Sequence, residues 1–238
     1  MVENQEISNP YSWKPWSGWY SFVLTLAKCT FICLGGKIRA INPENMPIGS
    51  PVILAPTHFS NLDPPAYACA CRRHLRFMAK EELFKGIFGK LIYTVGAFKV
   101  KRGTNDTSAI RQAIAILRND QALIVFPEGA RGDGVSIGEI NKGVALLARQ
   151  TEAFIVPAAI FGTHIMLPKG ATRVKRHQIT VIFGEPFRIS DLELTAQGEK
   201  VKISAKDFAE ELERRLLSLS AEIGLPLRPS LETKTTEN

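Results

Sequence analysis

Short apolar runs alternate with segments of helical periodicity along most of the chain. The apolar runs, bounded by turn residues, predict strands at 52–55, 75–79, 122–126, 153–161 and 179–183. Apolar residues at helical spacing predict helices over 105–120, 141–150 and 206–224. Strands interleaved with helices predict an α/β fold with a mixed, partly parallel sheet flanked by helices.

The N-terminal part has a different pattern. Residues 13–39, WKPWSGWYSFVLTLAKCTFICLGGKIR, hold all three tryptophans and an apolar run from Trp19 to Leu34. That run is about 24 Å long as a helix, shorter than a bilayer core of about 30 Å, and Lys28 interrupts it. It predicts an apolar helix lying at a membrane interface, with a helix buried against the domain as the alternative.

These patterns predict three regions. We expect residues 1–40 to form a membrane-associating segment, 41–224 to form one domain, and the polar end, 225–238, to form a flexible tail.

Charge adds a prediction about partners. The chain carries +7 overall, and 72–118 holds eleven basic residues against three acidic ones. This bias favours an anionic partner such as phospholipid headgroups or an acidic protein, although a solvated lysine-rich surface gives the same count. The four cysteines follow no disulfide pattern, which indicates a reducing compartment. Cys69, Cys71 and His74 match no zinc-binding spacing, so no metal is predicted.

The decapeptide PTHFSNLDPP, residues 56–65, directly follows the first strand of the domain. Asp63 before two prolines is typical of a helix N-cap. If the chain turns between the two residues, the Asp63 carboxylate reaches the His58 imidazole instead, and then fixes its tautomer and supports a general base. No serine or cysteine pairs with His58 as a nucleophile, so such a base acts on a hydroxyl of the substrate.

Two further stretches hold candidate binding residues. The exit of the strand 122–126, in LIVFPEGARGDG, carries Glu128, Gly129 and Arg131 in a glycine-rich loop that suits a polar or anionic ligand. In GAFKVKRG, residues 96–103, Lys101 and Arg102 suit a phosphate.

Taken in their order along the chain, the three stretches resemble the motifs of the glycerolipid acyltransferase family, the 1-acylglycerol-3-phosphate acyltransferases and their relatives. Residues 57–63 resemble the N-H-x-S-x-x-D motif, 101–103 the second motif and 126–132 the F-P-E-G-T-R-S motif, while Val156-Pro157 resembles the fourth. Thr57, Ala130 and Gly132 depart from the usual asparagine, threonine and serine.

The resemblance implies acyl transfer from a thioester to the free hydroxyl of lysophosphatidic acid, which gives phosphatidic acid. His58 would be the base and Asp63 would orient it. The acceptor would be bound by a basic pair and by the glycine-rich loop, namely Lys101, Arg102, Glu128, Gly129 and Arg131. No metal or cofactor is implied beyond the co-substrate, acyl-CoA or acyl-acyl carrier protein. The implied place is the membrane surface, on its cytoplasmic face.

Other functions remain open at this point. The acceptor could be glycerol-3-phosphate or another lysophospholipid. GVSIG, residues 134–138, matches the G-x-S-x-G elbow of serine hydrolases around Ser136, although no strand immediately precedes it. A non-catalytic lipid binder explains the charge and the tryptophans but gives His58 and Asp63 no chemical role. Nucleic acid is not expected, because the aromatic residues are not interleaved with the basic ones. His74, His164 and His177 are expected to be surface or packing residues.

Overall fold

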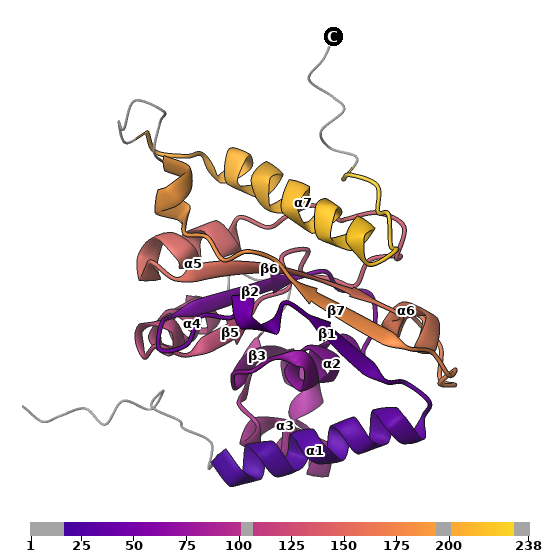
Figure 1. Cartoon of the computed structure of the whole chain (residues 1–238). Helices are drawn as coiled ribbons and strands as arrows, with labels where there is room; N and C mark the ends of the chain where they lie inside the picture. Colours follow the sequence, from indigo (N-terminus) through magenta and orange to yellow (C-terminus); the bar gives the residue numbers. More distant parts are fainter. Residues whose placement is uncertain (1–16, 101–106, 194–200, 231–238) are drawn as a thin grey trace, which may run out of the picture.

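The computed structural model describes residues 17–100, 107–193 and 201–230. A seven-stranded sheet forms its centre, with the strand order β1-β7-β6-β2-β5-β3-β4 (Figure 1). The strands are β1 Ile38–Ile41, β2 Val52–Pro56, β3 Leu75–Lys80, β4 Ala97–Val100, β5 Ala122–Ile124, β6 Phe154–Phe161 and β7 Ile179–Phe183. Only the β6–β7 pair is antiparallel among the described strands. The prediction of a mixed, partly parallel sheet is therefore confirmed.

Each of the five predicted strands is present, and two strands were not predicted. Both β1 and β4 are four residues long and occupy the two edges of the sheet. Edge strands are buried on fewer sides, so their sequences keep polar residues such as Arg39 and Lys99. That mixture hides them from a search for apolar runs.

Helices cover both faces of the sheet (Figure 1). One face carries α4 Thr107–Arg118, α5 Gly143–Thr151 and α7 Ala205–Glu222. The other carries α1 Ser17–Cys33, α2 Asp63–Ala70 and α3 Gly86–Thr94. This division follows from right-handed crossovers, because the chain moves one way along the sheet through α2 and α3 and the opposite way through α4 and α5. The short helices are η1 Pro43–Asn45, η2 Glu81–Phe84, α6 Thr163–Met166 and η3 Ile189–Glu193.

The core places β2 at the centre of the domain. Every residue of β2 is buried, as expected for a strand with neighbours on both edges and helices on both faces. Helix α7 packs on β6 and begins with a capping box, in which Ser204 accepts from the Asp207 N–H at 3.0 Å.

The domain extends past both predicted boundaries. Strand β1 starts at Ile38, inside the predicted N-terminal segment 1–40, because it pairs with β7. Leu225 and Leu227 are buried in the core although they fall in the predicted tail 225–238. Residues 231–238 lie outside the described residues, so the tail prediction is corrected for 225–230 and remains a prediction for the rest.

Helix α1 packs on α2 and leaves much of its own apolar surface exposed. Tyr20 and Phe31 are buried, whereas Phe22, Leu26 and Ile32 are about 60% exposed. In the described part of the chain, no helix combines the length and the apolar character needed to cross a bilayer.

Candidate active site

His58 lies two residues beyond the end of β2, at the carboxyl edge of the parallel strands. Loops at this edge are where α/β sheets place their ligands, because neighbouring parallel strands all end there. The loop after β5 reaches the same place: the Gly132 N–H donates to the His58 carbonyl at 2.8 Å. Two of the predicted motifs are therefore in contact.

Asp63 folds back onto His58 and does not cap α2. Its Oδ2 lies 2.9 Å from the His58 Nδ1 and accepts from the N–H groups of Phe59 at 2.6 Å and Ser60 at 2.8 Å. Those amides precede the helix, and the residue at the N-cap position, Leu62, makes no side-chain cap. The turn that the sequence left open is formed, and the cap interpretation of Asp63 is wrong.

The His58 ring is fixed on two further sides. It stacks on Phe126 with ring centroids 3.9 Å apart, and the whole residue is 7% exposed. Asp63 itself is fully buried, so the carboxylate meets the imidazole without competing water. Among the described residues none bonds to the His58 Nε2, which leaves that nitrogen for a substrate.

Glu128 lies in the loop after β5 and makes contacts that its sequence position does not reveal. Its Oε1 accepts from the His58 backbone N–H at 3.4 Å and its Oε2 from the Gly138 N–H at 2.8 Å. Burial raises the pKa of Glu128 from 4.5 to about 7, because desolvation outweighs the two backbone hydrogen bonds that lower it. No cation within the described ranges pairs with this carboxylate.

The other predicted binding residues differ in how far they can be placed. Gly129 has φ +67°, a left-handed conformation that favours glycine, and a Cβ there would lie 2.9 Å from the Asn141 Nδ2. Arg131 is half-buried, and its guanidinium makes no hydrogen bond or ion pair with the described part of the chain. Lys101 and Arg102 lie outside the described residues.

The structure does not form a serine hydrolase site around Ser136. This residue follows a loop instead of a strand, and its hydroxyl lies 3.4 Å from the Asp133 Oδ1. An elbow needs a strand before the serine and a helix after it.

The remaining histidines pack against aromatic side chains, as predicted. His74 lies against Tyr20 in a tilted arrangement with ring centroids 4.1 Å apart, and both His164 and His177 lie edge-on to Phe161. Burial lowers the pKa of His74 and of His164.

An apolar groove next to the His58 loop was not predicted from the sequence. It has a volume of about 280 Å³ and lies between α1, α2 and α3. Its lining includes Leu62 and Pro65, which flank Asp63 in the chain, together with Val23, Leu26, Ala27, Thr30, Phe31, Leu34 and Leu91. Its residues come from three separate segments, so no local pattern signals it.

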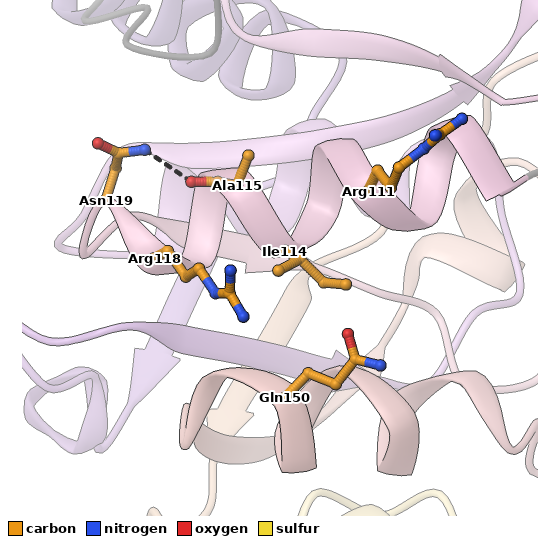
Figure 2. Close-up of a pocket in the computed structure, with 6 residues that line it drawn as sticks. All are labelled: Arg111, Ile114, Ala115, Arg118, Asn119 and Gln150. Atoms are coloured by element: carbon orange, nitrogen blue, oxygen red, sulfur yellow. Dashed lines mark hydrogen bonds between the residues drawn. The ribbon is translucent and has the colours of Figure 1, made fainter. Parts of the chain in front are cut away.

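A second hollow, of about 370 Å³, lies between α4 and α5 (Figure 2). Arg118 reaches from α4 toward α5, where Gln150 lines the opposite side, while Arg111, which also lines the hollow, points in a different direction from Arg118. The cationic side chains do not converge on one point, so this hollow is not a formed anion site.

The fold and the site together define a class of protein. A buried aspartate holds a histidine at the carboxyl edge of a parallel sheet, and no described nucleophile is bonded to that histidine. This arrangement is typical of an enzyme that uses a general base on a substrate hydroxyl.

Comparison with known proteins gives the family. A model of the acyltransferase family matches residues 37–161. The chain belongs to the acyltransferase family.

Named relatives agree with this family, and one solved structure has a similar fold. The chain is 32% identical to the 1-acyl-sn-glycerol-3-phosphate acyltransferase of Streptococcus pneumoniae, over 73% of this chain and 64% of the relative. It is 28% identical to the enzyme of the same name from Bacillus subtilis, over 72% of this chain and 84% of the relative. The crystal structure of the 1-acyl-sn-glycerophosphate acyltransferase of Thermotoga maritima superposes with a TM-score of 0.68 at 21% identity, covering 92% of this chain and 81% of that one. At this identity the superposition supports the fold alone.

Proposed function

We propose that this protein transfers an acyl group from a thioester to the free hydroxyl of lysophosphatidic acid and so forms phosphatidic acid. The observation that carries the proposal is the 2.9 Å hydrogen bond between His58 and the fully buried Asp63 at the edge of β2. The names of the curated relatives, 1-acyl-sn-glycerol-3-phosphate acyltransferases, supply the acceptor.

In the proposed reaction, the His58 Nε2 removes the proton of the acceptor hydroxyl. The hydroxyl oxygen then attacks the thioester carbonyl carbon, and the carbon–sulfur bond breaks as the ester forms. The imidazolium returns its proton to the departing thiolate, so no proton is gained or lost. Asp63 keeps the Nδ1 proton in place and stabilises the transient positive charge on the ring.

The acceptor phosphate is assigned to the basic residues near this edge. Arg131 has a guanidinium without a described partner, and it follows Gly129 in the same loop. A guanidinium can bind a phosphate through two parallel hydrogen bonds. Lys101 and Arg102 are assigned to the same phosphate on the family resemblance alone.

The acyl chain is assigned to the apolar groove between α1, α2 and α3. The groove is lined almost wholly by carbon, and its lining includes Leu62 and Pro65, on either side of Asp63. An acyl chain that lies there has its carbonyl end close to His58. Acyl-CoA or acyl-acyl carrier protein is the proposed donor, and no metal or other cofactor takes part.

The protein is proposed to bind the membrane surface through α1 and α3. We assign to this contact, the α1–α3 face, the exposed side chains of Phe22 and Leu26 on α1 and of Ile87 and Phe88 on α3. Trp19 joins the two helices by donating to the Thr94 Oγ1 at 2.9 Å. An exposed apolar face beside basic residues fits attachment to an anionic lipid surface. The proposed location is the cytoplasmic face of the membrane, which the proposed donors and the four free cysteines support.

The test is acyl transfer by purified protein in detergent, with acyl-CoA and acyl-acyl carrier protein offered in turn. Lysophosphatidic acid, glycerol-3-phosphate and other lysophospholipids are compared as acceptors. We expect phosphatidic acid to form from lysophosphatidic acid and its rate to fall by about a hundredfold or more in His58→Ala. Preference for another acceptor would change the proposed substrate but keep the acyl transfer. A fully active His58→Ala variant would contradict the proposed mechanism.

The same assay tests the hydrolase alternative. Ser136→Ala is expected to keep normal transfer, because Ser136 bonds to Asp133 and not to His58. Loss of all activity in Ser136→Ala, with the fold intact, would support the hydrolase instead.

A further inference from the structure

The Glu128 carboxylate lies in a small space at the active edge, which is the carboxyl edge of β2 and β5 where the loops with His58, Glu128 and Gly138 meet. It belongs to the loop after β5, and its two oxygens face the backbone of the β2 loop and of residue 138. Two glycines leave room for it: a Cβ on Gly132 would lie 3.2 Å from the Glu128 Oε2, and one on Gly138 would lie 3.1 Å from it. A side chain at either position would therefore be in tight contact with this carboxylate.

The loop after β5 makes two hydrogen bonds with the backbone of His58. The His58 N–H donates to Glu128, and the His58 carbonyl accepts from the Gly132 N–H in the same loop. Backbone contacts thus hold His58 from both sides, while Asp63 and Phe126 hold its ring. Both oxygens of Glu128 are thus engaged with protein N–H groups, which fixes the carboxylate between the two loops.

We infer that Glu128 is a positioning residue, which bridges His58 to Gly138 and holds the base in place, and is not a ligand of the acceptor. This role rests on the proposed acyl transfer and differs from the acceptor-binding role that the family resemblance implies for Glu128. The bridge fixes the β2 loop against the β5 loop and so sets where the His58 Nε2 meets the hydroxyl.

The geometry of the bridge also explains why a carboxylate is needed here. A carboxylate can accept on both oxygens, whereas the amide of glutamine accepts on one and presents N–H groups on the other. Glu128→Gln therefore sets an N–H against either the His58 or the Gly138 N–H. One side of the bridge opens while the volume of the side chain stays the same.

The kinetic test separates positioning from acceptor binding. In Glu128→Gln we expect kcat to fall by about 10- to 100-fold and KM for lysophosphatidic acid to stay within about twofold, because a misplaced base slows the chemical step. A KM that rises about tenfold with kcat preserved would mean that Glu128 binds the acceptor, and would overturn the inference.

A second variant reaches the same bridge from its other end. Gly138→Ala places a Cβ against the Glu128 Oε2 and is expected to lower kcat in the same direction. Gly143→Ala is the matched control, because no atom lies within 4 Å of its Cβ position, and it is expected to behave as wild type. Equal effects of the two alanines would contradict the bridge.

A readout without turnover separates this inference from the proposed function. The backbone amides of His58 and Gly138 are expected to exchange with deuterium faster in Glu128→Gln than in wild type, whereas the Ser60 amide, bonded to Asp63, keeps its rate. If wild type forms no phosphatidic acid but the exchange rates change as stated, the function fails and the bridge stands. If exchange at His58 and Gly138 is unchanged, the bridge is absent whatever the activity.

Discussion

The active edge and the α1–α3 face are held in opposite ways. At the active edge, buried polar groups are tied to one another: Asp63 accepts three hydrogen bonds on one oxygen, and Glu128 joins two loops. On the α1–α3 face, apolar side chains such as Phe22 and Ile87 lie in the open, and the Trp19–Thr94 bond links the two helices. The hydrogen bonds of the first region hold its side chains in one geometry, whereas the second region exposes apolar area to solvent.

Because the two regions are held differently, we expect them to tolerate different kinds of substitution. A buried polar group that loses its partner costs the full desolvation of what remains, so small changes at the active edge have large effects. An exposed apolar side chain contributes through its area, so single changes on the face have moderate effects that add. Variants of the two regions should therefore separate chemistry from membrane attachment.

The largest expected effect is at Asp63. The Asp63 Oδ2 accepts from His58 and from the Phe59 and Ser60 amides, and in Asp63→Asn this place is taken at best by a neutral amide oxygen, so the positive charge that forms on the His58 ring loses its stabilising carboxylate. We expect kcat to fall by about a hundredfold or more, measured with both substrates saturating. Asp133→Asn, at an exposed aspartate bonded to Ser136, is the control and should keep its activity. Equal losses in both variants would point to a general effect of charge.

Next in size is the loss of Arg131. Arg131→Ala is expected to raise KM for lysophosphatidic acid by about tenfold or more, because a charge-assisted hydrogen bond to phosphate contributes about 1.5–3 kcal/mol. Arg111→Ala, at an exposed arginine beside the α4–α5 hollow, removes the same charge elsewhere and should leave KM unchanged. If the acceptor KM is insensitive to Arg131, the phosphate assignment is wrong.

A smaller effect is expected on the α1–α3 face. Phe22→Ser combined with Ile87→Ser should weaken binding to vesicles of phosphatidylcholine and phosphatidylglycerol by about tenfold, because each exposed side chain adds apolar area to the contact. Co-sedimentation measures this, and transfer to a short-chain acceptor below its micelle concentration should be preserved. Ile48→Ser changes an equally exposed side chain on the loop before β2 and should bind vesicles as wild type does. Equal weakening in Ile48→Ser would place the contact elsewhere.

The smallest effect concerns stability against pH. The folded pKa of Glu128, about 7, lies above its ordinary value of 4.5, so the folded state keeps a proton that the unfolded state has lost between these values. The contribution of Glu128 is thus fully present below pH 4.5 and is lost as the pH rises through 7, at up to about 1.4 kcal/mol per pH unit. In Glu128→Gln the free energy of unfolding, from urea titrations across this window, should fall less steeply with pH. Parallel curves for both proteins would contradict the raised pKa.

The sequence predicts the central strands better than the edges. Buried strands such as β2 and β6 are continuous apolar runs, so their pattern suffices, whereas β1, β4 and α3 are short and carry polar or glycine residues. The two domain boundaries were misplaced for a related reason: the pairing of Ile38 with β7 and the burial of Leu227 depend on residues far along the chain.

In the candidate site, too, contacts between residues close in the chain were predicted and contacts between separate segments were not. His58 and Asp63 are close in the chain, so a turn alone brings them together. The sequence allowed one alternative, Asp63 as a helix N-cap, which only the structure excludes. The contacts of Glu128 with His58 and Gly138, and the groove beside Leu62, join separate segments that no local motif records. Lys101 and Arg102 lie outside the described residues, and their phosphate role stays a prediction.

The central claim is that His58 and Asp63 act as one unit in acyl transfer, and a double-mutant cycle tests it most directly. Transfer rates are measured for wild type, His58→Ala, Asp63→Asn and the double variant, with each fold checked by thermal melting. The account predicts that Asp63→Asn slows wild type by about a hundredfold but slows His58→Ala by less than about threefold, because Asp63 acts through the imidazole. A full hundredfold loss from Asp63→Asn in the absence of the His58 imidazole would contradict it.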